Sequence, residues 1–330
     1  MPLFDATAKG SDEYPFISVI IPAYNEERMV SQCLASLRRV SYPKQKFEII
    51  VVDNGSRDKT REIAGSFGAI VLTDETATVS GLRNLGAQKA RGELLAFVDS
   101  DCVVFPEWLS LGASYVSMSN LVAWGAPPAP PGDGTWVQSA WYLVRKKKAG
   151  IQLVEWLESM NLFVRKSHFA KIEGFNENLV TAEDVDLCYR LSQFGKIISD
   201  PRIEVVHLGE AATIREFVRK EIWRGMGNLK GLRSHEFKLS ELPSLILPLY
   251  FGFLLPVILV VGIILEGVFI FFPLLAMVIL PSLLLCLKVL ARGYQHGNLF
   301  HLFVLSQFYF FSRVFSVFFS IISFGKNKLF

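Results

Sequence analysis

The sequence predicts an α/β domain with a mostly parallel sheet and flanking helices, followed by C-terminal transmembrane helices. Short apolar runs such as Ile17–Pro22 and Phe47–Val52 alternate with segments whose apolar residues recur at helical spacing. Near-continuous apolar strands between helices are typical of a parallel sheet that is buried on both faces. The charge density then falls, because residues 242–330 contain only six charged side chains. So few charges over such a length are typical of membrane helices.

Strands and helices alternate in the front part of the chain. We expect strands at residues 17–22, 47–52, 69–72 and 93–98, separated by helices at 26–40, 57–67 and 79–91. Polar clusters follow three of these strands, at Ala23–Glu26, Asp53–Ser56 and Asp99–Asp101. The carboxyl ends of parallel strands meet at one edge of the sheet, which is where ligands bind. The three clusters therefore predict a ligand site at that edge.

Composition and known fingerprints exclude several classes of protein. The net charge of +3 over 330 residues lacks the basic excess of a nucleic-acid-binding protein. Neither a dinucleotide-binding glycine motif nor a P-loop is present. The cysteines form no C-x-x-C pair and are scattered, which predicts reduced thiols in the cytosol and no zinc knuckle. The first residues lack the features of a signal peptide, so we expect the front domain to stay on the cytoplasmic side.

Asp99 and Asp101 lie within one tripeptide after an apolar strand. Two close carboxylates repel each other unless a positive charge lies between them. Mg²⁺ or Mn²⁺ is the simplest partner, because hard cations take oxygen ligands and keep positions open for phosphate. A turn in which aspartate caps a helix is the alternative. The position of the pair at the end of a strand favours the cation site.

Other polar residues admit two interpretations each. Asp53 could accept a hydrogen bond from a base or a ribose, or it could only shape a turn. Arg83, on the third predicted helix, could pair with phosphate. Glu183 and Asp184 precede a helix-like stretch, so they either offset a helix dipole or supply a general base.

The C-terminal part predicts a membrane domain at 242–330. Residues 242–265 and 268–290 are long enough to cross a bilayer and look like a tight helical hairpin. Residues 299–324 carry a polar stripe, so this run is either a third span with the stripe against the hairpin, which we favour, or a helix in the membrane interface.

The predicted membrane domain also sets the boundaries of the segments that precede it. Residues 1–16 form an N-terminal tail, and residues 17–210 form the front domain. Residues 211–241 form a juxtamembrane segment, in which Thr213–Lys238 is either an amphipathic helix on an anionic leaflet or a solvated surface helix.

Several short motifs follow one another along residues 17–210. They are Ser18–Glu26, Val52–Asp58, Gly81–Gly86, Arg91–Glu93, Asp99–Asp101, Asn161–Arg165, Gly174–Glu177 and Glu183–Leu187. In this order they resemble glycosyltransferase family 2, and membrane-attached bacterial members in particular. The resemblance implies a nucleotide-sugar-binding fold of the glycosyltransferase A type and inversion at the anomeric carbon.

The resemblance also implies roles for individual residues. The donor would be held by Pro22, Ala23, Tyr24, Glu26, Asp53, Arg83 and Asp99. Asp101 and Asp99 would bind a divalent cation, Mg²⁺ or Mn²⁺, and His207 either completes that metal site, as in some relatives, or has only a structural role. Asp184 would be the catalytic base, with Glu183 beside it to bind or orient the acceptor.

These features favour an inverting glycosyltransferase that moves a single sugar to a hydroxyl of a lipid-linked saccharide in cell-envelope or exopolysaccharide synthesis. The expected partners are a nucleotide-sugar donor, the lipid-linked acceptor and membrane lipids, with no nucleic acid. The resemblance to the family implies that the donor is a UDP-sugar. The expected location is the bacterial inner (cytoplasmic) membrane, as a multi-pass protein with its catalytic domain in the cytoplasm.

Three alternatives to this function agree less well with the sequence. Processive synthases of the family carry a Gln-x-x-Arg-Trp motif, which the stretch Arg219–Arg224 lacks, so single-sugar transfer is favoured. A polyprenyl-phosphate glycosyltransferase needs no base, so Glu183 and Asp184 argue against it. The third alternative is a non-catalytic membrane scaffold or a sugar-nucleotide sensor, against which the intact acidic clusters count.

Overall fold

The computed structural model describes residues 14–146, 150–179, 181–226, 246–248, 250–264, 271–292 and 298–322. The chain divides into two compact units. Unit 1 comprises Met1–Ala129 and Ala149–Gly209, and unit 2 comprises Pro130–Lys148 and Glu210–Phe330. The sequence-based interpretation placed residues 130–148 in the front domain, whereas in the structure they associate with unit 2. Residues 1–13 of the predicted tail and residues 227–241 of the juxtamembrane segment lie outside the described residues.

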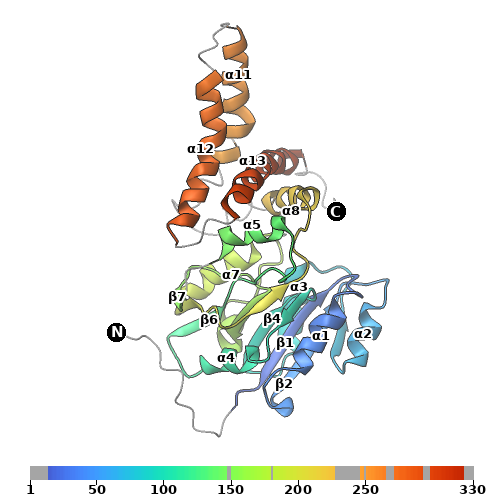
Figure 1. The fold of residues 1–330 in the computed structure, drawn as a ribbon. Coiled ribbons are helices and arrows are strands. Elements are labelled where there is room, and N and C mark those ends of the chain that lie inside the picture. Colours follow the sequence, from blue (N-terminus) through green and yellow to red (C-terminus); the bar gives the residue numbers. More distant parts are fainter. Residues whose placement is uncertain are drawn as a thin grey trace. The chain divides into compact units, whose positions relative to one another are not determined.

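Unit 1 is built on an eight-stranded sheet with the order β3-β2-β1-β4-β8-β6-β9-β7 (Figure 1). The strands that build unit 1 are β1 (Ile17–Ala23), β2 (Phe47–Asp53), β3 (Ile70–Thr73), β4 (Leu94–Val98), β5 (Cys102–Val104), β6 (Leu121–Gly125), β7 (Gln152–Leu153), β8 (Asn161–Arg165), β9 (Lys196–Ser199) and β10 (Val205–His207). Strands β3, β2, β1 and β4 are mutually parallel, whereas β8 is antiparallel to both β4 and β6. A separate antiparallel pair joins β5 to β10. The predicted mostly parallel sheet is confirmed.

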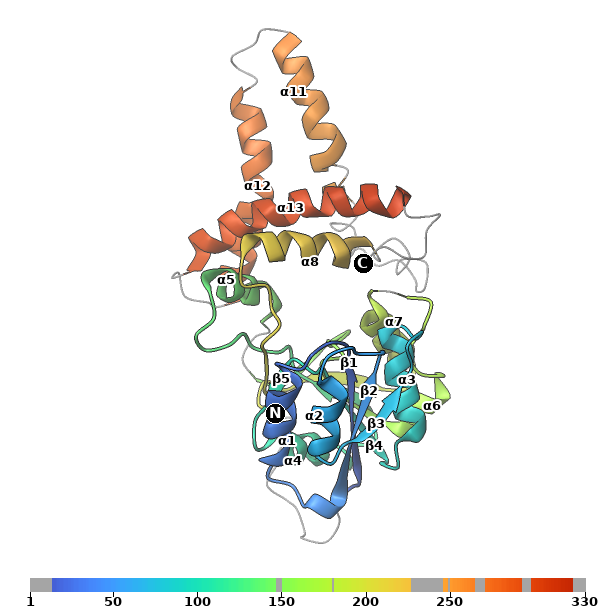
Figure 2. The ribbon, with the colours of Figure 1, turned by 90° about the vertical axis from the view of Figure 1, so that its right-hand side faces the viewer.

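Helices cover both faces of this sheet, as Figure 2 shows. The helical segments of unit 1 are α1 (Val30–Arg38), η1 (Lys44–Lys46), α2 (Thr60–Ser66), α3 (Val79–Lys89), α4 (Trp108–Ser114), α6 (Lys166–Lys171) and α7 (Glu183–Ser192). Side chains alternate between the two faces along a strand. On β1, Val19 and Ile21 therefore pack with α1 and α4, whereas Ile20 packs with α3, α6 and α7. Burial on both faces explains the continuous apolar runs in the sequence.

Asn161 on β8 fixes the middle of the sheet from a fully buried position. Its Oδ1 accepts a hydrogen bond from Trp108 Nε1 at 2.9 Å. Its Nδ2 donates to the carbonyl oxygens of Ala126 and Ile203 at 2.9 and 2.8 Å. The side chain thereby joins three segments that are remote in sequence.

We expect Asn161→Ala to destabilise the protein by about 3 kcal/mol, because an indole N–H and two carbonyls would be left buried without partners. This corresponds to a fall in melting temperature of roughly 6–12 °C, measured by circular dichroism on the detergent-solubilised protein. Asn178→Ala is the matched control, because Asn178 is exposed, and it should leave the melting temperature unchanged. Equal melting temperatures for both variants would show that the three hydrogen bonds contribute nothing.

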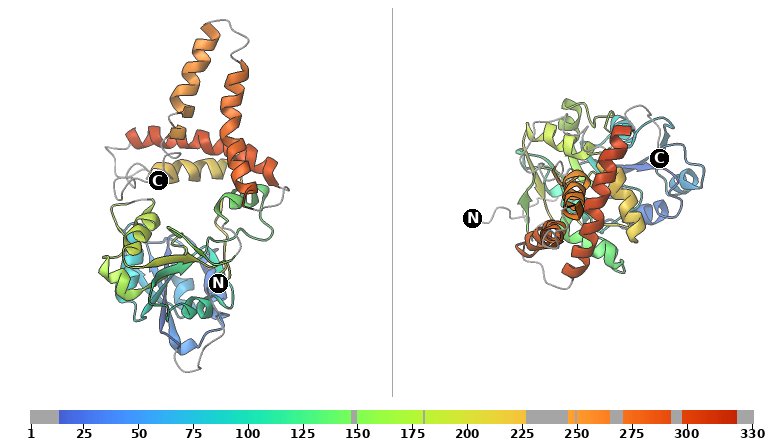
Figure 3. Two further views of the ribbon diagram at one scale, coloured as in Figure 1. Left: turned by 90° about the vertical axis from the view of Figure 1, so that its left-hand side faces the viewer. Right: turned by 90° about the horizontal axis from the view of Figure 1, so that it is seen from above.

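Unit 2 is helical. It contains α5 (Trp136–Arg145), α8 (Ile214–Met226), the π-helical turn η3 (Tyr250–Leu254), α11 (Leu255–Ile264), α12 (Phe271–Leu290) and α13 (Leu299–Ile322). Helices α8 and α13 run side by side, and α11 and α12 stand crosswise to them (Figure 2). Seen from above, α11 and α12 are viewed end-on, whereas α8 and α13 lie lengthwise (Figure 3).

Two residues of the polar stripe of α13, Arg313 and Ser316, face α8. Arg313 Nη2 lies 2.8 Å from Glu221 Oε2, and both side chains are largely buried. A β-carbon at Gly225 of α8 would clash with Ser316, so the two helices approach closely there. The prediction that this stripe contacts the hairpin is therefore wrong for Arg313 and Ser316. Helix α13 contacts α12 through other residues, such as Ser306, whose hydroxyl donates a hydrogen bond to Ser282 Oγ at 2.7 Å. Helical periodicity identifies residues that share a face, but it does not identify the helix they meet.

One described helix is long and apolar enough to cross a membrane, namely α13 over Leu299–Val317. Shorter apolar helical stretches occur at Ile246–Val261 and Val278–Leu290, within the two predicted spans 242–265 and 268–290. Parts of both predicted spans lie outside the described residues.

Candidate active site

The first two polar clusters meet at the carboxyl ends of β1 and β2. Ala23 lies opposite Asp53 in the register of the two strands. Beyond them, the Asn25 N–H donates to Ser56 Oγ at 2.9 Å, and the Glu26 N–H donates to Thr60 Oγ1 at 2.8 Å. These hydrogen bonds hold the two loops together. Tyr24, which is predicted to bind the nucleotide-sugar donor, has about half of its surface exposed at the edge of the sheet.

Asp53 is fully buried, but only one of its carboxylate oxygens is satisfied. Oδ1 accepts from the N–H groups of Gly55 and Ser56 at 3.0 and 2.9 Å, and Arg61 Nε lies 3.6 Å from it. Oδ2 has no hydrogen-bond partner among the described residues. A buried acceptor without a partner costs free energy, so it marks a place where a ligand N–H or O–H fits. This observation suits the predicted nucleoside-binding role of Asp53.

Arg83 of α3 joins the third polar cluster to the beginning of α7. Its Nη2 lies 2.8 Å from Asp99 Oδ1, and its Nη1 lies 3.0 Å from Glu183 Oε1. The Arg83 side chain is only 3% exposed, and its guanidinium lies 5.5 Å from the centre of the Phe175 ring. One buried cation thus holds together two acidic clusters that are remote in sequence. Sequence reasoning placed Arg83 near the base and diphosphate and missed this bridge.

Asp184 follows Glu183 in the first turn of α7 and has an unusual environment. Burial raises its pKa to about 8, and the charges of Glu183 and Glu158 act in the same direction. Arg83 and the N–H of Val185 oppose this shift. A carboxyl group that titrates near neutral pH is suited to take up a proton during a reaction. Glu158 lies in an irregular segment before β8, where the sequence carries no signal for it.

Ala182 positions Glu183 and Asp184 through its backbone. Its φ of 64° and ψ of 18° place it in the left-handed region directly before α7. This conformation is strained for a residue with a β-carbon. The strain lies next to the two acidic side chains, as is common at functional sites.

Replacing Ala182 with glycine should therefore stabilise the protein by about 1 kcal/mol, because glycine adopts this conformation without steric cost. The melting temperature should rise by roughly 2–4 °C, as measured by differential scanning fluorimetry. Ala113→Gly in the buried face of α4 is the control and should lower it, because glycine destabilises helices. A fall in both variants would contradict the assignment of strain to Ala182.

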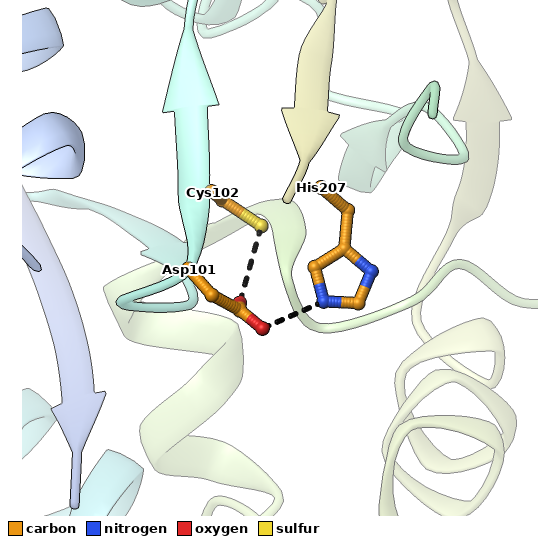
Figure 4. Close-up of side chains that lie close together, drawn as sticks. All are labelled: Asp101, Cys102 and His207. Carbon is orange, nitrogen blue, oxygen red and sulfur yellow. Dashed lines mark hydrogen bonds and ion pairs between the residues drawn. The ribbon is translucent and has the colours of Figure 1, made fainter. Parts of the chain in front are cut away.

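Asp101, Cys102 and His207 form the second part of the site (Figure 4). Asp101 Oδ2 lies 2.9 Å from His207 Nε2, and Cys102 Sγ lies 3.8 Å from Asp101 Oδ1. Each residue offers one ligand atom, and these atoms all lie within 4.8 Å of one another. A β-carbon at Gly209 would clash with the Asp101 carboxylate, so glycine is required beside it.

The donor set fits a divalent cation, because the carboxylate and the imidazole offer ligand atoms close enough together to bind one ion. The structure thus brings the predicted ligands Asp101 and His207 together. Asp99 is turned toward Arg83. Cys102 directly follows Asp101, but nothing in the sequence around it indicates a ligand role.

The predicted site residues all belong to unit 1. Asp53 ends β2 and Asp99 follows β4. These strands are the two neighbours of β1, so they lie about 10 Å apart. Asp99 and Glu183 share Arg83. The fold and this site define the class of protein: a glycosyltransferase A-type domain with its acidic residues at the carboxyl edge of the parallel strands.

Comparison with known proteins places the chain within this class. The family model described as Glycosyl transferase family 2 matches residues 18–166. Glycosyltransferase AglE from Haloferax volcanii is 31% identical over 249 residues, which cover 73% of this chain and 82% of AglE. Validoxylamine A glucosyltransferase from Streptomyces hygroscopicus subsp. limoneus is 25% identical over 226 residues, 56% of this chain and 50% of that protein. The chain belongs to glycosyltransferase family 2, and it is a glycosyltransferase.

A solved structure supports the fold. The mannosyltransferase PcManGT from Pyrobaculum calidifontis, solved in complex with GDP-Man and Mn²⁺, superposes with a TM-score of 0.61 at 15% sequence identity. The match covers 96% of this chain and 88% of PcManGT. The glycosyltransferase A fold implied by the sequence motifs is therefore confirmed.

Proposed function

We propose that this glycosyltransferase transfers a single sugar, with inversion, from a nucleotide-sugar donor to a hydroxyl group of a lipid-linked saccharide in cell-envelope or exopolysaccharide synthesis. The observation that carries the proposal is the buried bridge of Arg83 to Asp99 and Glu183. It connects the donor side of the site to the segment that carries a candidate base. PcManGT binds GDP-Man and Mn²⁺, which supports a nucleotide-sugar donor and a divalent cation here.

The donor half of the reaction rests on the residues at the strand ends. Asp53 offers its unpartnered Oδ2 to an N–H or O–H of the nucleoside. Exposed Tyr24 offers a ring face to the base. Asp101 and His207, with Asp99 nearby, would hold Mg²⁺ or Mn²⁺. A divalent cation bound there supplies positive charge that offsets the charge of the departing diphosphate.

The acceptor half rests on Asp184. Its carboxylate takes the proton of the acceptor hydroxyl as the oxygen attacks the anomeric carbon from the face opposite the leaving group. The bond from that carbon to the diphosphate oxygen breaks, and the nucleoside diphosphate leaves with the electron pair. Glu183, held by Arg83 at 3.0 Å, orients the acceptor, so that both reactants are aligned before reaction.

We infer further that unit 2 attaches the enzyme to the cytoplasmic membrane, where lipid-linked acceptors are concentrated. The apolar faces of α11 and α12 expose Ile263, Ile264, Leu284 and Leu287, which suits contact with lipid. Because α13 lies crosswise to α12 (Figure 2), both helices cannot stand along the bilayer normal. We therefore favour a helical hairpin that enters the bilayer and an α8–α13 pair that lies in the interface.

The test uses the full chain in nanodiscs, radiolabelled nucleotide-sugars and a lipid extract as acceptor source. Transfer of label to the organic-extractable fraction, lost with EDTA and restored by Mn²⁺ or Mg²⁺, is the expected result. Mild acid then releases the labelled sugar from its lipid phosphate, and the size of the released product identifies the acceptor. A labelled disaccharide or larger oligosaccharide would support a glycosidic bond to a saccharide, whereas a labelled monosaccharide would identify a polyprenyl-phosphate acceptor and refute the hydroxyl-acceptor proposal.

A further inference from the structure

The strand pairing of β5 with β10 places a thiol at the candidate metal site. His207 lies directly opposite Cys102 in this antiparallel pair. Side chains of directly opposed residues lie on the same face of an antiparallel pair. Cys102 Sγ therefore lies beside the same carboxylate that His207 contacts, as Figure 4 shows. Both Cys102 and His207 are buried, and the Asp101 side chain is partly exposed.

The ligand set of these three residues has mixed chemistry. Mg²⁺ and Mn²⁺ prefer oxygen ligands, whereas thiolate and imidazole suit Zn²⁺ and related cations. In a tetrahedral zinc site the metal lies about 2.3 Å from sulfur and about 2.0–2.2 Å from nitrogen and oxygen, so ligand atoms are roughly 3.3–3.8 Å apart. The Asp101, Cys102 and His207 ligand atoms lie within 4.8 Å of one another, a wider limit than those separations, so small side-chain shifts would bring them to one cation.

We propose that Asp101, Cys102 and His207 form a three-ligand site for thiophilic divalent cations such as Zn²⁺, Co²⁺ and Cd²⁺, overlapping the site that serves the transfer reaction. The proposal extends the proposed function, because it uses the same Asp101 and His207. On binding, the thiol proton of Cys102 leaves to solvent and the sulfur bonds to the cation. Water occupies the fourth position. A cation held in this way competes with Mg²⁺ or Mn²⁺, so micromolar zinc should inhibit the enzyme.

Cobalt binding tests the site without any sugar transfer. The probe is Co²⁺ added to the full-length, donor-free protein in detergent, followed by absorption spectroscopy. We expect a sulfur-to-cobalt charge-transfer band in the near ultraviolet, with visible bands of the intensity typical of tetrahedral cobalt. Cys102→Ser should abolish the charge-transfer band. Cys33→Ser is the matched control, because Cys33 is also a buried thiol but lies outside the ligand set, and it should keep the band.

Competition experiments give a second readout. Cys102→Ser should weaken Zn²⁺ binding at least tenfold, measured by a chelator assay, and change Mn²⁺ binding less than twofold. Cys102→Ala, checked for folding by circular dichroism, shows whether an effect of Cys102→Ser comes from loss of the thiol or from the introduced serine hydroxyl. Absence of the charge-transfer band in the unmodified protein, or its persistence in both Cys102 variants, would overturn the proposal. Cation-dependent transfer would remain measurable in that case, so a failure of the thiol site is distinguishable from a failure of the proposed function.

Discussion

Asp184→Asn is expected to lower the turnover number of sugar transfer about a thousand-fold, because the variant keeps the size of the side chain but cannot accept the acceptor proton. Asp184 is partly buried and lies next to Glu183, so water should be an inefficient substitute for its role. Steady-state kinetics with a radiolabelled donor measure the effect. Donor affinity, measured separately by calorimetry, should stay within a factor of two to three.

Glu183→Gln is the matched control for this experiment. Glu183 contacts Arg83 and is not placed as the base, so its loss should reduce turnover less than that of Asp184. Near-full activity of Asp184→Asn would refute the assignment of the base. The same result would favour a phosphate acceptor, which carries its negative charge before it reaches the enzyme.

The pH dependence follows from the direction of the Asp184 shift. The base acts in its ionised form, and burial raises its pKa to about 8. The ratio kcat/KM for the acceptor should therefore rise with pH and level off above about 8, and this inflection should disappear in Asp184→Asn. A carboxyl whose pKa is raised in the folded state favours folding at low pH. Its contribution to stability is therefore lost as the pH rises toward 8.

Arg83→Met should cause a large loss of stability, similar to that expected for Asn161→Ala. Without the guanidinium, Asp99 and Glu183 become neighbouring, largely buried carboxylates with no cation between them. Breaking a buried ion pair on one side costs about 3 kcal/mol, so the melting temperature of the donor-free protein should fall by roughly 6–12 °C. Turnover should fall as well, because the α7 segment loses its attachment to α3.

A melting temperature measured without donor distinguishes two possible roles of Arg83: bridging Asp99 and Glu183, or contacting the donor diphosphate. A residue that only contacts the donor diphosphate would leave the melting temperature of the donor-free protein unchanged. Arg83→Lys is the conservative control, since it keeps the charge but not the two-pronged geometry. We expect it to recover part of the stability. An unchanged melting temperature in Arg83→Met would contradict the bridging role.

The parallel half of the sheet could be predicted from local sequence, because apolar runs of the right length end in polar clusters. Predicted helix ends differ by a few residues, as for α1, which begins at Val30 rather than at residue 26. The other half, from β8 to β7, was not predicted as a sheet. Its strands are short, and its order depends on the antiparallel insertion of β8 between β4 and β6. Such long-range pairing leaves no local signal.

The candidate site could be predicted in part for the same reason. Asp53, Asp99 and Asp101 follow strands, so topology alone brings them to one edge. The roles of Asp184 and His207 came from motif resemblance, and the residue roles themselves stay predictions. The contacts of Arg83 and the alignment of Cys102 with His207 depend on tertiary packing and strand register. Neither can be derived from spacing along the chain.

The insertion of β8 also bears on how the nascent chain folds. Strands β4 and β6 both pair with β8, so each has an open edge until residues 161–165 have been synthesised. Open edges of apolar strands recruit other chains, and such non-local pairing forms slowly. Ribosomal pausing before Asn161 should therefore increase aggregation and chaperone dependence, whereas pausing after β8 has emerged should have a smaller effect.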